Sequence, residues 1–135
     1  MLFRSGAHVA DFCTAGYTSD LIGKWVRERQ VLSLEQAIKR TTSEPADFFG
    51  IRERGRLTPG FAADIAIFDR DTVDTAPVET RDDFPAGARR LFADSIGMER
   101  VMVRGTTVLH RGRDTGARPG QFLVRARDTD TVGVG

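Results

Sequence analysis

Residues 50–69 read GIRERGRLTPGFAADIAIFD, and this stretch marks a change in the pattern of the chain. Pro59 and Gly60 predict a tight reversal, because Pro presets φ at the first turn position and Gly accepts a positive φ at the next. Residues 63–68 are nearly all apolar, which is typical of a short strand covered on both faces. Apolar residues recur at helical spacing before this stretch, and short apolar runs separated by Gly and Pro follow it. The order predicts an α+β chain.

Three helices are predicted before residue 50. The first spans residues 20–29, and each helix has a recognisable start. These signals are the capping residues Thr18 and Ser19 for the first helix, the capping box of Ser33 and Gln36 for the second, and Pro45 in the first turn of the third. Phe48 and Phe49 are expected to form the buried end of the third helix.

Strands and turns are predicted after the reversal. Gly105 separates two apolar runs and indicates a hairpin. The other expected features are a strand at 100–104 paired with 106–110, a surface excursion over 70–98 with a helical turn near 88–92, a further strand at 121–125 and a flexible tail at 128–135.

Composition limits the classes of function. The chain has 135 residues and a formal net charge of +1, with 20 basic and 19 acidic residues. Basic and acidic residues alternate, so no nucleic-acid partner is expected. The single cysteine excludes an intrachain disulfide framework and a multi-cysteine zinc module. No apolar run approaches the roughly 20 residues that span a bilayer. We therefore expect a cytoplasmic protein without a membrane partner.

The stretch 50–69 resembles a signature of the amidohydrolase superfamily, in which a Gly-x-Leu-x-Pro-Gly turn leads into an Ala-Asp-hydrophobic strand. Residues 33–46 are similar to the helix pair that closes the family barrel. Residues 6–9, which read GAHV, and residues 25–28 resemble the N-acyl-D-amino-acid deacylase branch, which is D-aminoacylase-like. Residues 101–120 fit the same pattern. The resemblance covers about residues 6–125.

The resemblance implies a metal-dependent hydrolase (β/α)8 barrel, a TIM barrel, flanked by a small β-sandwich. Such a barrel needs roughly 250 residues and at least about 200. We therefore expect this chain of 135 residues to be the C-terminal fragment of a longer enzyme. In that reading residues 1–50 are the last barrel helices, residues 51–127 are part of the β-sandwich, and residues 128–135 are the flexible tail.

The family reaction is hydrolysis of a non-peptide amide bond, here of an N-acyl-D-amino acid. A zinc-type ion activates a water molecule, and a carboxylate at the last barrel strand moves the proton. The family pattern Ser-Asp-x-Gly-Ala-His would place that carboxylate at position 4, where this sequence has Arg4. Arginine cannot act as a base because it does not deprotonate in a protein.

Metal ligands are also missing from the expected pattern. The histidines are His8 and His110, about a hundred positions apart, and no His-x-His pair occurs. The resemblance places the family's ligands upstream of this chain, so we expect no catalytic residue, no metal ligand and no bound zinc here. His8 remains the candidate for substrate binding, at the mouth of the family barrel. The fragment by itself is expected to be inactive.

Each candidate residue could have a structural role instead of a functional one, and for most of them we favour the structural role. His8 would be an exposed side chain, Asp11 a helix cap or surface charge, and Cys13 a small buried thiol instead of a nucleophile. Asp64 would satisfy backbone donors of a turn. Trp25 would belong to the core or an interface. The arginines that could form a basic strip but are expected to be a solvated face are Arg111, Arg113, Arg118, Arg125 and Arg127.

Two other functions compete with the deacylase reading. The first is a non-catalytic interaction or oligomerisation module that self-associates through unpaired strand edges. The second is a small nucleic-acid binder that uses the arginines, and the near-zero net charge argues against it.

Overall fold

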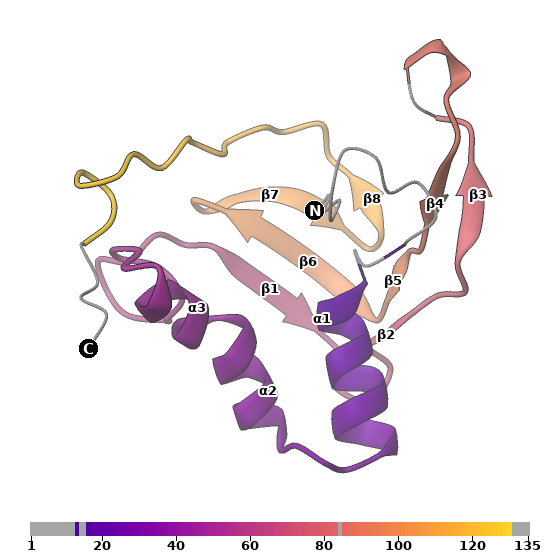
Figure 1. The fold of residues 1–135 in the computed structure, drawn as a ribbon, viewed down its shortest axis with the longest axis horizontal. Coiled ribbons are helices and arrows are strands. Elements are labelled where there is room, and N and C mark those ends of the chain that lie inside the picture. The colour runs from indigo at the N-terminus through magenta and orange to yellow at the C-terminus, as the bar shows by residue number, and fades with distance from the viewer. Residues whose placement is uncertain (1–12, 14–15, 84, 131–135) are drawn as a thin grey trace. The chain divides into compact units, whose positions relative to one another are not determined.

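The computed structural model describes residues 13, 16–83 and 85–130, and the chain divides into two compact units (Figure 1). The described part of the first unit comprises residues 13, 16–31 and 69–97 without residue 84. The second unit comprises residues 32–68 and 98–130. The expected division into barrel residues 1–50 and sandwich residues 51–127 describes parts of a larger enzyme. The two units do not test it, and it stays a prediction.

One continuous helix opens the first unit. The α-helix α1 (Tyr17–Asp20) runs directly into a π-helix, η1 (Leu21–Glu28). The first predicted helix is therefore confirmed, but it begins earlier than residue 20. Thr18 and Ser19 lie within this helix, so their prediction as capping residues was wrong. The position before the helix is occupied by Gly16, and no side chain caps it.

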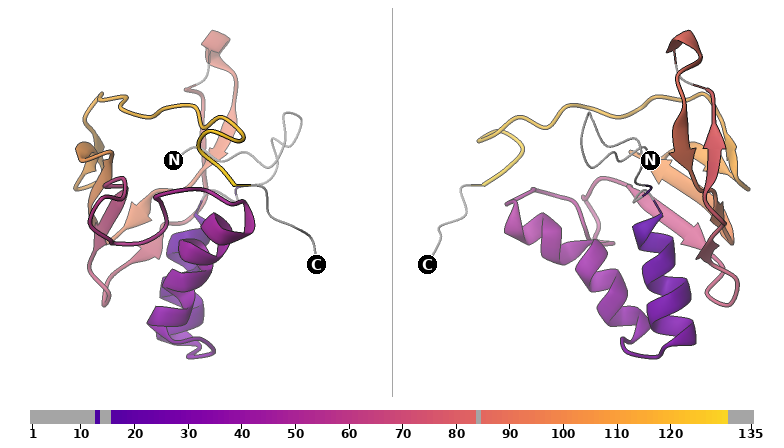
Figure 2. Two further views of the ribbon diagram at one scale, coloured as in Figure 1. Left: turned by 90° about the vertical axis from the view of Figure 1, so that its left-hand side faces the viewer. Right: turned by 45° about the vertical axis from the view of Figure 1, so that its right-hand side comes forward.

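The segment 69–97 forms two antiparallel ribbons, where an irregular surface excursion over 70–98 was expected. The helical turn expected near 88–92 was wrong, because residues 90–92 form a strand. The elements are β2 (Asp74–Thr75) with β5 (Ser95–Ile96), and β3 (Glu79–Arg81) with β4 (Arg90–Phe92), beside the short 3-10 helix η2 (Pro85–Gly87). Figure 2 shows β3 and β4 running side by side. Arg81 and Arg90 both stack on the Phe92 ring, at 3.8 and 4.5 Å from its centroid. This ribbon is stabilised by arginine–phenylalanine stacking and by ion pairs. Its sequence lacks the apolar alternation that predicts strands, and the strands were therefore not expected.

Arg27 joins the first helix to the ribbons. Its guanidinium donates to the carbonyl of Val73 at 2.6 Å and to the carboxylate of Asp74 at 2.8 Å. The hydroxyl of Thr75 donates to the carbonyl of Gly16 at 2.9 Å. Val73 between these contacts is fully buried. The first unit is thus organised around residues 73–75, a contact between segments about fifty positions apart.

Two short helices begin the second unit. The helix α2 (Leu34–Thr41) has the predicted capping box: the Gln36 amide donates to the Ser33 hydroxyl, and the Ser33 amide to the Gln36 side chain. Pro45 lies in the first turn of α3 (Ser43–Phe48), as predicted. The expected burial of the helix end was wrong, because Phe48 and Phe49 are 73% and 62% exposed and pack edge-to-face on each other.

A four-stranded antiparallel sheet completes the second unit. Its strands follow the order β1 (Ile65–Phe68), β6 (Met98–Val103), β7 (Thr106–His110) and β8 (Arg113–Asp114). The predicted hairpin around Gly105 is confirmed. The reversal before β1 is also present, because the Phe61 amide donates to the Thr58 carbonyl at 3.0 Å. The expectation that β1 is covered on both faces was wrong, since Ile67 is 45% exposed at the edge of the sheet.

The segment after β8 departs from the prediction. Residues 121–125 do not form a strand, although Arg125 makes an isolated bridge to Thr129. Residues 128–130 differ from the flexible tail expected there: the Asp130 amide donates to the Gly50 carbonyl at 2.7 Å, and Thr129 bridges to Ile51. The pairing partner is far away in sequence, so a local pattern could not reveal it. The remainder of the predicted tail, 131–135, lies outside the described residues.

Few hydrophobic side chains are buried among the described residues. The buried ones are Ile22, Ala37, Ala46 and Val73. Large hydrophobic residues with more than a third of their surface exposed are more numerous, and they include Phe48, Phe49, Leu57 and Phe122. Single exposed apolar residues are ordinary, but this imbalance indicates incomplete cores. Within the described part of the chain, no helix is long and apolar enough to cross a membrane.

Candidate functional site

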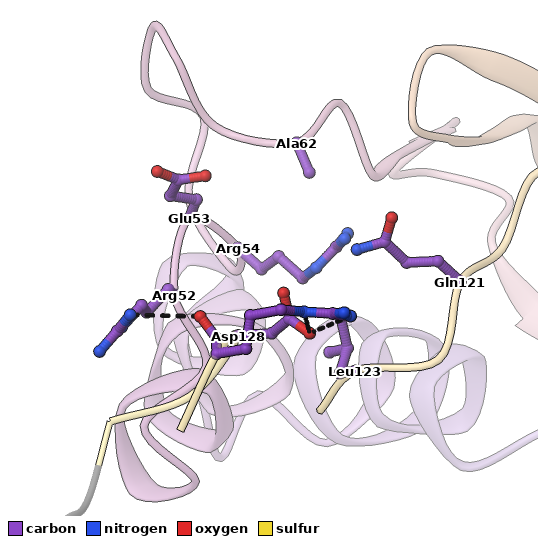
Figure 3. Close-up of a pocket in the computed structure, with 8 residues that line it drawn as sticks. Arg52, Glu53, Arg54, Ala62, Gln121, Leu123 and Asp128 are labelled. Carbon is purple, nitrogen blue, oxygen red and sulfur yellow. Dashed lines mark hydrogen bonds and ion pairs between the residues drawn. The ribbon is translucent and has the colours of Figure 1, made fainter. Parts of the chain in front are cut away.

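A cavity of about 200 Å³ lies in the second unit, where the segment after α3 faces the segment after β8 (Figure 3). One wall comes from the reversal before β1 and the other from the end of the described chain. The lining residues are Arg52, Glu53, Arg54, Ala62, Gln121, Leu123, Arg127 and Asp128. Two segments about seventy positions apart thus form the cavity together.

Ion pairs surround the cavity. Arg52 donates through Nε to the Asp130 carboxylate at 2.7 Å. Arg127 donates through Nε and Nη2 to one oxygen of Asp128, at 3.0 and 2.8 Å. The hydrogen bond to Asp130 raises the pKa of Arg52, and the hydrogen bond from Arg127 lowers the pKa of Asp128. The Arg127–Asp128 pair therefore favours the charged form of both partners, since the same contact raises the pKa of Arg127.

Asp64 makes the third pair and links three segments. Its Oδ2 accepts a hydrogen bond from Arg54, a cavity residue, and its Oδ1 accepts the backbone amide of Arg104 at 2.9 Å. The next amide, of Gly105, donates to the carbonyl of Ala63 at 2.9 Å. The predicted structural role of Asp64 is confirmed, with the difference that its amide donor comes from the β6–β7 turn and not from its own turn.

These ion pairs hold chain segments together, and Asp128 among them is poorly suited to proton transfer. A general base works best with a pKa near the operating pH. The Asp128 carboxylate has a lowered pKa and also accepts the Val124 amide at 2.7 Å. A carboxylate stabilised in this way is a weak base. The cavity therefore lies between two segments of the second unit that ion pairs hold together.

The donors of the described residues do not fit zinc. A catalytic zinc site uses three protein ligands, typically His with Asp, Glu or Cys, and leaves one position open. Among residues 13, 16–83 and 85–130, no group of three or more such side chains could hold a metal ion. The cavity brings only two carboxylates, Glu53 and Asp128, and no histidine.

The candidates near the chain start are not described. Arg4, His8 and Asp11 lie outside the described residues, so the substrate-binding role of His8 stays a prediction. Cys13 is partly exposed, which differs from the buried thiol expected. His110 lies on β7 with its Nε2 at 3.5 Å from Glu99.

The remaining candidates lie at the surface. Trp25 is 41% exposed, and Arg29 stacks over its ring at 5.0 Å. Trp25 is thus not a core residue, and no contact in the structure tests an interface role. Three of the arginines pair with carboxylates: Arg111 with Glu99, Arg118 with Asp114 and Arg127 with Asp128. This neutralises most of the basic strip.

Sequence reasoning missed the cavity. Arg52 lies in the signature stretch 50–69, but nothing local shows that this stretch meets the segment of Gln121. The alternation of Arg52, Glu53 and Arg54 indicates only that this part of the sequence has no block of like charges. The one signal in the sequence was the presence of Asp128 and Asp130 near the end of the chain, which are possible ion-pair partners for these arginines.

The chain is similar to known enzymes over most of its length. The model of the amidohydrolase family matches residues 4–109. The N-acyl-D-glutamate deacylase of Alcaligenes xylosoxydans xylosoxydans is 39% identical over 111 residues, which are 82% of this chain and 20% of that protein. The dihydroorotase of Lactobacillus gasseri is 34% identical over 98 residues, 70% of this chain and 22% of that protein.

Solved structures give the same relationship. D-aminoacylase superposes with a TM-score of 0.60 at 28% identity, over 76% of this chain and 20% of that structure. The zinc- and phosphonate-bound N-acyl-D-glutamate deacylase of Bordetella bronchiseptica superposes with a TM-score of 0.55 at 37% identity, over 73% and 20%. The chain thus spans about a fifth of the length of the relatives it matches. It belongs to the amidohydrolase family.

Proposed function

We propose that this chain forms the last barrel helices and part of the flanking β-sandwich of a metal-dependent deacylase. Its substrates would be N-acyl-D-amino acids, and the reaction would be hydrolysis of the non-peptide amide bond. The observation that carries the proposal is the 39% identity to an N-acyl-D-glutamate deacylase over 111 residues. An N-acyl-D-aspartate deacylase is 34% identical over 113 residues, which supports the same substrate class.

In this proposal residues 1–50 belong to the barrel and residues 51–127 to the sandwich. The order of elements supports the assignment, because α2 and α3 precede the reversal and the β1–β6–β7–β8 sheet. The exposed aromatic side chains of Phe48 and Phe49 support it as well. Apolar surface of this kind is stabilised when it is covered by other parts of a protein. We also propose the cytoplasm as the compartment, since the chain has a single cysteine.

Zinc would be held by residues outside this chain. Relatives solved with a zinc ion or described with a binuclear metal center support a metal for the family reaction. This sequence contains only two histidines and one cysteine, and Arg4 occupies the position of the expected carboxylate. We therefore propose that the chain alone neither retains zinc nor hydrolyses an N-acyl-D-amino acid.

A chimera tests the proposal. The matched segment of the Alcaligenes N-acyl-D-glutamate deacylase is replaced by residues 6–125 of this chain, so that the relative keeps its own residues before Gly6. The expected result is a folded protein that retains zinc and hydrolyses N-acyl-D-glutamate. A folded chimera without hydrolysis would contradict the proposal.

A second chimera provides the matched control. It begins two residues earlier and therefore carries Arg4 in place of the expected carboxylate. We expect it to fold and to lose hydrolysis, because a guanidinium cannot accept the proton. If both chimeras were equally active, the role of position 4 inferred from the resemblance would be wrong.

A non-catalytic module that self-associates is the second candidate. The observation in its favour is β1, an edge strand of the sheet with Ile67 45% exposed. Exposed apolar edge strands pair readily with other strands. Light scattering after gel filtration would detect dimers, and Ile67→Lys should return them to monomers. The matched control is Ile96→Lys on the edge strand β5, where the exposure is 47%. If the unsubstituted chain is monomeric, a self-associating module is excluded.

A further inference from the structure

Residues 124–130 fold back on themselves as a closed turn. The amides of Arg127 and Asp128 both donate to the carbonyl of Val124, at 3.2 and 2.8 Å. The Asp128 carboxylate accepts the Val124 amide in return, at 2.7 Å, and Ala126 has a φ of 68°. This turn is therefore stabilised by its own hydrogen bonds before any contact with the remainder of the unit.

The closed turn is fastened to the segment that follows α3. The Arg52 amide donates to the carbonyl of Asp128 at 3.0 Å, and the Asp130 amide donates to the carbonyl of Gly50 at 2.7 Å. The Arg52 side chain reinforces both ends. It donates to the Asp130 carboxylate at 2.7 Å and to the Arg127 carbonyl at 3.2 Å. Arg52 is thus the residue with the most contacts across this junction.

Little apolar burial supports the junction. Phe122 is 85% exposed and Val124 is 38% exposed. The side chains of Arg52 and Asp130 are themselves 48% and 62% exposed. Hydrogen bonds and exposed ion pairs therefore carry the attachment. Exposed ion pairs contribute little stability and less at high salt, because the Debye length shortens from about 10 Å at 0.1 M to about 3 Å at 1 M. The attachment should therefore weaken as salt is added.

The same segment forms one wall of the cavity. Gln121, Leu123, Arg127 and Asp128 come from it (Figure 3). The opposite wall is fixed by the Arg54–Asp64 pair. We infer that residues 121–130 form a detachable strap, that Arg52 is its clasp, and that the strap closes the cavity of about 200 Å³ when it is attached. This inference is independent of the proposed deacylase function.

Hydrogen–deuterium exchange read by mass spectrometry tests the strap. The variants are Arg52→Ala and Asp130→Asn, and the second keeps an oxygen acceptor while removing the ion pair. The control is Arg118→Ala, which breaks a more exposed pair with Asp114 outside the strap. We expect several-fold faster exchange in residues 124–130 in both clasp variants, with the β6 and β7 amides unchanged. Arg118→Ala should leave the strap unchanged.

Salt provides the second readout. Raising the ionic strength should speed exchange of the strap in the unmodified chain and have little further effect in Arg52→Ala. Exchange in 124–130 that does not respond to the clasp variants would overturn the inference. A uniform increase across the whole second unit would overturn it as well, because the strap would then not open independently.

Discussion

Asp64 is a single residue on which three segments of the second unit depend. It accepts a side-chain hydrogen bond from Arg54 and a backbone hydrogen bond from Arg104, and its side chain is only one-third exposed. Asp64→Ala should lower the free energy of unfolding by about 1–3 kcal/mol, because it removes the charged acceptor of two hydrogen bonds. Urea denaturation measures this change. Asp64→Asn should lose less, since its carbonyl can still accept the Arg104 amide. If Asp64→Ala unfolds at the same midpoint as the original chain, the linking role is wrong.

Gly97 is a position where both space and backbone require glycine. Its φ is 68°, and an added Cβ would lie 2.6 Å from the amide nitrogen of Val73. Gly97→Ala should cost about 1–2 kcal/mol from backbone strain and about 1–3 kcal/mol from overpacking. Thermal denaturation is the measurement.

Gly87 is the matched control for that substitution. It has the same φ of 68°, lies in the same unit and has no atom within 4 Å of an added Cβ. Gly87→Ala should therefore show the strain cost alone. Equal losses at the two positions would mean that the contact between Gly97 and Val73 is unimportant.

The start of α2 is the element whose stability is most easily tested. Ser33 and Gln36 cap it reciprocally, at 3.2 and 3.0 Å. Ser33→Ala should cost about 0.5–2 kcal/mol, because one amide of the first turn loses its acceptor. Chemical denaturation followed by far-UV circular dichroism measures the loss. Ser43→Ala at the start of α3, where no side chain caps the helix, should have a smaller effect. A larger loss at Ser43 would contradict this assignment.

Elements with local signals could be predicted from the sequence. The capping box at Ser33, the turn at Pro59 and the hairpin at Gly105 each depend on residues within a few positions of one another. The ribbons β2–β5 and β3–β4 could not be predicted, because Arg stacking on Phe92 and contacts to Arg27 hold them. The burial of Phe48 was predicted wrongly, since helical periodicity indicates an apolar face but not what covers it.

The cavity shows the same limit on a larger scale. Arg52 contacts Asp130 across 78 positions, and no local pattern indicates that these two residues pair. Family membership, by contrast, could be inferred from residues 50–69 alone, because the turn and strand pattern is specific. The sequence therefore predicted the relationship to known enzymes better than it predicted the contacts of individual side chains.

For the molecule as a whole, paired carboxylates set the response to acid. The pKa values of four aspartates are lowered, in each case chiefly by a hydrogen bond from an arginine. The pairs are Asp47 with Arg56, Asp83 with Arg90, Asp114 with Arg118 and Asp128 with Arg127. A lowered pKa in the folded state contributes stability above the unfolded value of about 3.9 and loses it as the pH falls through the folded value. The melting temperature should therefore change little through these pairs between about pH 5 and 8, and fall below about pH 4. A loss between pH 7 and 5 would require a different group.

Zinc content and hydrolysis, measured together on the purified chain, test the central claim most directly. The chain is incubated with zinc, desalted and analysed for bound metal, and then assayed for hydrolysis of N-acyl-D-glutamate. We expect far less than one zinc per chain and no turnover, because the resemblance places the metal ligands upstream of this chain and Arg4 occupies the position of the carboxylate. One retained zinc per chain together with turnover would contradict it.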